Sequence, residues 1–145
     1  MLKAKKTDER KKHRLRVIGS SQFKDKVKEA LKLIKTAKYY AFFRTNIKRI
    51  VEVDGLSQLR EEEAFIWANK YTVADPVEAA SYFIQKTEQM KYYLEGKPYF
   101  GGIEEAKATE KRIEFLQELK NKSRRKDVRE RCEEALKRWD ESKFL

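Results

Sequence analysis

The chain has 145 residues, which is enough for one domain with a hydrophobic core but short for two. Lys and Arg number 35 against 24 Asp and Glu, so the net charge is +11. The candidate partners are nucleic acid, an acidic membrane surface or an acidic protein, and a charge that serves only solubility is the alternative. The single cysteine excludes an intramolecular disulfide and any metal site built from several cysteines. This Lys- and Glu-rich composition with few glycines is common in proteins from hot-growing organisms.

The first 13 residues are polar and basic and have no apolar periodicity. We expect residues 1–13 to form a flexible basic arm, and residues 14–145 to form a single globular domain. No apolar run approaches the length of a transmembrane segment, and the N-terminus lacks the hydrophobic stretch of a signal peptide. These patterns predict a cytoplasmic protein.

The N-terminal half predicts a strand, two helical runs and two further strands. A short strand is expected over residues 15–18, before a helix that Ser20 or Ser21 caps. Five apolar residues at helical spacing indicate that helix: Phe23, Val27, Ala30, Leu31 and Ile34. The aromatic run over residues 39–50 has mainly helical spacing, although strand character stays open. Strands are expected over residues 50–54 and 64–73, where β-branched and aromatic residues are frequent.

The C-terminal half predicts three helices. Asp75-Pro76-Val77-Glu78 is a strong helix start, in which Asp caps, Pro occupies the first position and Glu78 reaches back to the cap. That helix should end near Leu94. The next is expected over residues 103–121, buried along Ile103, Ala106, Ile113 and Leu116. The last carries Val128, Cys132, Ala135, Leu136 and Trp139 at helical spacing.

Together these elements predict an α+β fold. We expect one small domain in which four or five helices pack on a short, mostly antiparallel sheet. A mainly helical bundle is the alternative.

The second half of the chain also carries a spaced pattern of polar, aromatic and glycine residues. It contains Gln85-x-x-x-Gln89, then Tyr93-x-x-Gly96-x-Pro98-Tyr99-x-Gly101, then Glu105-x-x-Ala108. This pattern resembles a group of small predicted zinc metallopeptidases, the mini-zincins, and the segment from Val17 to Leu31 looks like the beginning of that group. The resemblance covers most of residues 17–119.

The resemblance implies zinc ligands that this chain lacks. It implies His at the positions of Gln85 and Gln89, an acidic general base at Lys86 and an acidic third ligand at Glu105. Zinc hydrolysis needs three protein ligands and a carboxylate that takes a proton from the bound water, and only Glu105 remains. The resemblance therefore implies a degenerate member, a pseudo-metallopeptidase that acts by binding, with no catalytic residue, metal or cofactor.

Ordinary helix chemistry explains the same residues equally well. Gln85 and Gln89 suit a half-exposed helix face, and acids such as Glu105 are favoured in a first helical turn. Neither interpretation predicts proteolysis.

Nucleic-acid binding is the alternative function. Its candidate residues lie in the N-terminal arm and in a basic segment before the last helix, the 120–126 cluster. They are Lys11, Lys12, Arg14, Lys120, Lys122, Arg124, Arg125 and Lys126. Base stacking by the aromatic run at 39–43 is less favoured than a role in the core, because its spacing is helical.

Overall fold

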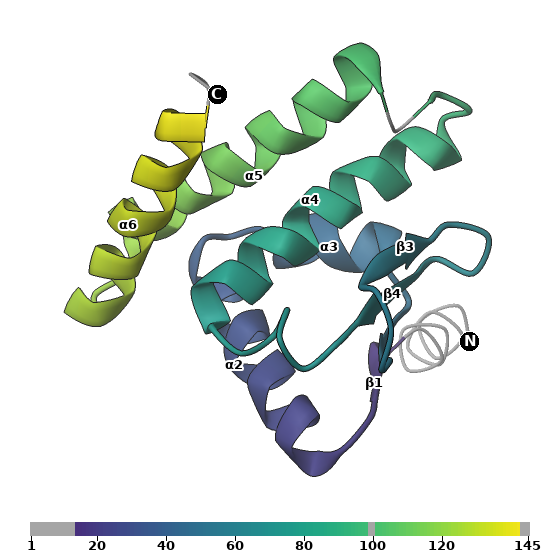
Figure 1. Ribbon diagram of the computed structural model, residues 1–145, viewed down its shortest axis with the longest axis horizontal. Helices are drawn as coiled ribbons and strands as arrows, with labels where there is room; N and C mark the ends of the chain where they lie inside the picture. The colour runs from purple at the N-terminus through teal and green to yellow at the C-terminus, as the bar shows by residue number, and fades with distance from the viewer. Residues whose placement is uncertain (1–13, 99–100, 143–145) are drawn as a thin grey trace, which may run out of the picture.

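The computed structural model describes residues 14–98 and 101–142 (Figure 1). This part contains five helices and a four-stranded sheet, which confirms the predicted α+β class with one small domain. The N-terminal arm predicted over residues 1–13 lies outside the described residues, as do Lys11, Lys12 and His13. None of the described helices combines the length and the apolar character needed to cross a membrane.

The elements follow one another with short connections. They are β1 (Arg16–Ile18), α2 (Ser21–Thr36), α3 (Tyr40–Asn46), β2 (Arg49–Glu52), β3 (Gln58–Arg60), β4 (Phe65–Ala68), α4 (Pro76–Leu94), α5 (Gly102–Lys122) and α6 (Lys126–Ser142).

The sheet is mixed, with the strand order β1-β2-β4-β3. β1 pairs parallel with β2, β2 pairs parallel with β4, and only the β3–β4 pair is antiparallel. The expectation of a mostly antiparallel sheet is therefore wrong. The reason lies in the connections. Helices α2 and α3 return the chain to the end of the sheet where β1 began, so β2 runs parallel to β1. The chain then reverses into β3 at the outer edge and reverses again into β4, which therefore lies beside β2 and parallel to it.

The strand predicted over residues 64–73 is shorter than expected, and β3 was not predicted at all. β4 ends at Ala68 because the next residue, Asn69, forms a turn: its Oδ1 accepts hydrogen bonds from the backbone N–H groups of Tyr71 and Thr72 at 3.1 and 3.0 Å. The Asn69 N–H donates to Ser57 Oγ at 2.9 Å, which fixes the approach to β3. Side-chain hydrogen bonds between loops thus decide where these strands stop and start.

Helix α4 lies at the centre of the molecule and is buried on nearly all sides. Its buried residues include Phe83, Ile84 and Met90, which join one core cluster with residues of α2, α3 and the sheet. Ile50, Leu59 and Ile66 line the sheet face that belongs to this core. In Figure 1, α5 and α6 lie on the far side of α4 from the sheet. Its buried residues include the polar Ser81, Thr87, Glu88 and Gln89, so this central helix is buried without being apolar on every side.

The buried side of α5 differs from the predicted one. Ile103 is 69% exposed and Ala106 is also exposed, while Leu116 is buried as expected. The buried residues of α5 are Ala108, Phe115, Leu116 and Leu119. The contact therefore begins at Ala108, in the second turn of the helix, and the first turn after Gly101 stays exposed.

The cap of α4 forms only in part as predicted. The Asp75 carboxylate accepts a hydrogen bond from the backbone N–H of Glu78 at 3.4 Å. Glu78 does not complete the box, because its two carboxylate oxygens accept hydrogen bonds from Arg112 and Arg138. A helix-start acid thus becomes part of a contact between three helices.

Candidate functional site at the α4–α5 interface

Helices α4 and α5 form the most extensive contact in the described fold, and they run antiparallel. Gln85 lies opposite Thr109 and Arg112 of α5, while the earlier residues Ser81 and Glu78 contact the later of these two, Arg112. Positions therefore decrease along α4 as they increase along α5. This course places the polar residues of the zincin-like pattern on one interface, with α6 beside its lower end (Figure 1).

Arg112 is the centre of the interface. Its Nε donates to Ser81 Oγ at 2.9 Å, its Nη1 to Gln85 Oε1 at 2.8 Å, and its Nη2 to Glu78 Oε2 at 3.3 Å. The guanidinium also lies over the Trp139 ring of α6, 5.1 Å from the ring centroid. Burial lowers the pKa of Arg112, and Glu78 opposes this shift. One cation thus joins α4, α5 and α6.

Lys86 brings a second cation to the same interface. Its Nζ lies 5.3 Å from the centroid of the Tyr82 ring. Burial first, and then the like charge of Arg112, lower the pKa of Lys86, whereas the carboxylate of Glu105 raises it in part. The Tyr82 hydroxyl is buried without a hydrogen-bond partner in the described part of the chain, and burial raises its pKa. Lys86 is therefore charged at an energetic cost.

Removing the Lys86 charge is expected to stabilise the protein. We expect Lys86→Met to raise the free energy of unfolding by about 1 kcal/mol at neutral pH, because a half-buried cation beside another cation is replaced by an apolar side chain of similar length. The gain should shrink as pH rises towards the unfolded pKa of Lys, since the wild-type amine then loses its charge in both states. Urea unfolding between neutral and alkaline pH measures both effects.

Lys91→Met is the matched control, because Lys91 lies on the same helix and is exposed. It should change the free energy of unfolding by no more than about 0.5 kcal/mol. Equal effects of the two substitutions, or a loss of stability in Lys86→Met, would contradict the cost assigned to the Lys86 charge.

The remaining two positions of the pattern differ in exposure. Gln89 is buried, at 7% exposure, and follows Gln85 by one turn on α4. Glu105 is exposed, and its Oε2 accepts a hydrogen bond from the backbone N–H of Gly101 at 2.7 Å. The antiparallel course of the helices brings the turn of Gln89 to the level of Glu105. Gln85 therefore contacts α5 directly, the carboxylate of Glu105 acts on the Lys86 charge, and the hydrogen bond of Glu105 is made at the start of its own helix.

The groups at this interface do not fit a zinc ion. Gln85 Oε1 already accepts a hydrogen bond from the Arg112 guanidinium, and the charges of Lys86 and Arg112 lie close enough to repel each other. Zinc sites use imidazole, thiolate or carboxylate ligands. Among the four positions of the pattern Glu105 alone is such a group, and the nearby Glu78 carboxylate is already bound by Arg112 and Arg138. Within residues 14–98 and 101–142, no cluster of three or more His, Cys, Asp or Glu side chains is placed to hold a metal.

The 120–126 cluster is largely neutralised by neighbouring acids. Lys120 pairs with Glu133 at 3.4 Å, Lys122 with Glu118 at 2.9 Å and Lys126 with Glu130 at 3.9 Å. Arg125 makes two hydrogen bonds to Asp127, of 3.2 and 2.7 Å. Arg124 is exposed, as is Arg14 at the other end of the described chain. The predicted nucleic-acid residues do not form one continuous surface in this part of the structure.

Arg112 was not among the predicted site residues. An arginine is a weak signal in a chain with 35 basic residues. Its position two turns after Glu105 would have placed it on the same face of α5 as that acid, and this spacing was the available clue.

The comparisons with known proteins leave the family open. No protein-family model, no curated protein and no solved structure matches this chain.

Proposed function

We propose that this protein is a non-catalytic, zincin-like scaffold that works in the cytoplasm by binding a partner. The observation that carries the proposal is the Arg112 network. Gln85, at a position where the resembled family would have a zinc ligand, accepts a hydrogen bond from the Arg112 guanidinium, and Lys86 stands where that family would have its general base.

Electrostatics supports this proposal. Arg112 is hydrogen-bonded to Gln85 and the charge of Lys86 is near enough to be repelled by it. Two positive charges at a partly buried interface oppose a divalent cation strongly, because water screens the repulsion less. Ser81 and Gln85 also have a structural role, because their contacts with Arg112, together with the Arg112–Trp139 contact, join α4, α5 and α6. A scaffold that keeps its helices but fills the metal position with cations is suited to binding and not to hydrolysis.

Nucleic acid is the partner class that we favour, because the net charge is +11. Four of the five cations predicted in the 120–126 cluster pair with carboxylates, so they are poorly available to phosphates. Any strong contribution must come from basic residues elsewhere on the chain.

Metal content and zinc titration calorimetry test the proposal. We expect protein purified without an affinity tag to contain no stoichiometric zinc, and titrated zinc to bind no more tightly than to surface carboxylates. The control is Glu105→Ala, which should behave like the wild type in this titration. Stoichiometric zinc that disappears in Glu105→Ala would overturn the proposal and reopen the case for an enzyme.

A further inference from the structure

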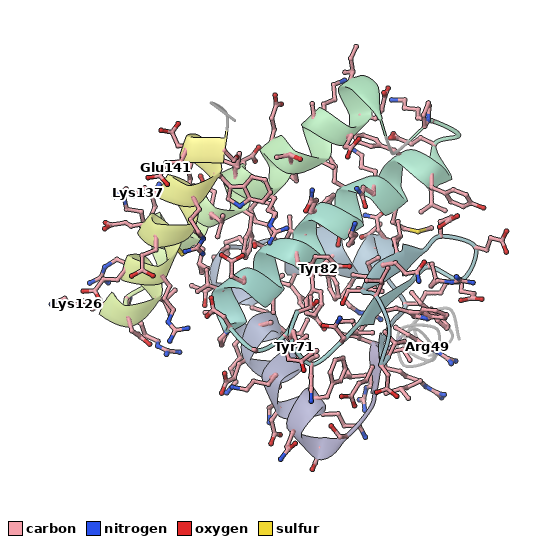
Figure 2. The ribbon with its side chains drawn as sticks, in the orientation of Figure 1. Arg49, Tyr71, Tyr82, Lys126, Lys137 and Glu141 are labelled. Atoms are coloured by element: carbon pink, nitrogen blue, oxygen red, sulfur yellow. The ribbon has the colours of Figure 1, made fainter. Side chains whose placement is uncertain are left out.

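The sheet has a second face that does not belong to the core. Ile50, Leu59 and Ile66 point to the helices, so the alternate residues of each strand point away from them. Arg16, Arg49, Phe65 and Arg60 form one cross-strand row on this outer face, and Ile18, Val51, Trp67 and Gln58 form the next. In Figure 2, Arg49 projects from the sheet on the side opposite α5 and α6.

Two aromatic rings on this face lie beneath arginine side chains. The Arg49 guanidinium is 5.1 Å from the centroid of the Phe65 ring, and that of Arg60 is 4.3 Å from the centroid of the Trp67 ring. Both rings are partly exposed. They stand two residues apart on β4, so they are roughly 6.6 Å apart along the strand and face the same way.

Within the described residues, the outer face has positive charge that no ion-paired acid offsets. None of its eight residues is acidic. Among the described residues, Arg16, Arg49 and Arg60 have no carboxylate within 4.0 Å, in contrast to the cations of the 120–126 cluster. No carboxylate of the described residues therefore competes with an external anion for these three guanidinium groups.

We propose that the outer face of the sheet, defined by the eight residues of these two rows, binds single-stranded nucleic acid. Phe65 and Trp67 each stack on one base, and Arg16, Arg49 and Arg60 contact the phosphates or extend the stacks with their guanidinium planes. The inference rests on the proposed binding function and gives it a partner and a surface.

The geometry distinguishes single strands from duplexes. The bases of a duplex are stacked on each other, so they cannot lie flat on rings that project from a sheet. A single strand can turn two neighbouring bases onto Phe65 and Trp67 while its backbone crosses the arginines. The face should therefore prefer single strands and show little sequence specificity.

Charge complementarity also selects this occupant over others. The chain's own residues 1–13 are strongly basic, and a second copy of the sheet would bring arginine against arginine. An acidic peptide would satisfy the guanidinium groups but would leave the two rings without flat partners. A polyanion that carries aromatic bases satisfies both kinds of group.

Fluorescence anisotropy with labelled oligonucleotides of about 12 nucleotides tests the proposal on the full chain. We expect saturable binding of single-stranded RNA or DNA and much weaker binding of the same sequence as a duplex. Tighter binding of RNA would indicate contacts to the ribose hydroxyl, and equal binding would indicate stacking and phosphate contacts alone. Both results support the proposal. Failure to bind either single strand, or equal binding of the duplex, would overturn it.

Matched substitutions separate the outer face from general charge. Arg49→Gln with Arg60→Gln should weaken binding about 10-fold or more and reduce the salt slope by about 1.4. Lys126→Gln with Lys137→Gln removes the same charge from α6, on the opposite side of the molecule in Figure 2, and should have a small effect. Equal losses in the two variants would show that the outer face is not the site.

The fluorescence of Trp67 distinguishes base stacking from purely electrostatic binding. The chain has two tryptophans, Trp67 and Trp139, so in Trp139→Phe the emission comes from Trp67. Stacking of a base on Trp67 should quench that emission as the oligonucleotide saturates the protein. Trp67→Leu should weaken binding about 10-fold while keeping the apolar character of the position. Unchanged emission at saturation would exclude stacking at this residue.

Unlike the zinc titration, the oligonucleotide experiments do not depend on the α4–α5 interface, so the two proposals can fail separately.

Discussion

A chain that carries Gln85→His, Lys86→Glu and Gln89→His is expected to bind one zinc ion. Two histidines one turn apart on α4 project from the same face, and Glu105 lies at the level of position 89 on the antiparallel α5. The Lys86 change also removes one of the two cations that oppose a metal. We expect an affinity at least about 1000-fold above that of the wild type, measured by calorimetry or by competition with a chromogenic chelator.

The matched control adds Glu105→Gln to the same three changes. It keeps both histidines and removes the third ligand, so zinc should bind at least about 10-fold more weakly than in the three-fold variant. Equal affinities would show that Glu105 does not reach the metal and that the zincin-like assignment of these positions is wrong. Absence of zinc binding in the three-fold variant would have the same meaning.

Arg112→Met is expected to lower the free energy of unfolding by about 2 to 3 kcal/mol. The substitution leaves Ser81, Gln85 and Glu78 without a shared donor in a partly buried interface, and it removes the stacking partner of Trp139. This expected loss is a net value, because the substitution also removes the desolvation cost of the buried guanidinium. Urea unfolding followed by circular dichroism measures the difference.

Arg138→Met is the control, because Arg138 and Arg112 bind the two oxygens of the same carboxylate. The Arg112 side chain is 13% exposed, whereas that of Arg138 is 60% exposed. An exposed ion pair contributes little, so Arg138→Met should cost less than about 1 kcal/mol. If the two substitutions cost the same, the effect of Arg112 would be that of a surface ion pair and not of a buried network.

The sequence predicted those elements whose signals are local. Ser20 caps α2 through a hydrogen bond from the Phe23 N–H, and Asp75 caps α4, both as the residue types indicate. The α6 stripe of Val128, Cys132 and Ala135 is buried, and burial raises the pKa of the Cys132 thiol to about 11. Helical periodicity and capping act within one element, so they can be found without knowledge of its neighbours.

The parts that were missed depend on contacts between distant segments. The direction of β4 depends on β3, a three-residue strand that is too short for a period-two pattern. The Arg112 network joins residues 78, 81, 85, 112 and 139, and no local rule links them. The outer sheet face was missed for the same reason, because Arg49 and Arg60 flank Phe65 only once the register of three strands is known.

The two edge strands of the sheet have a consequence for self-association. β1 and β3 are each three residues long, so each edge offers few free backbone groups to a strand of another molecule. Each edge strand also carries an arginine, Arg16 on β1 and Arg60 on β3. If the same edges of two molecules paired, these like charges would repel each other. Short edges that carry positive charge are a common defence against aggregation through added strands. The short, charged edges thus protect the sheet from added strands, whatever its outer face binds.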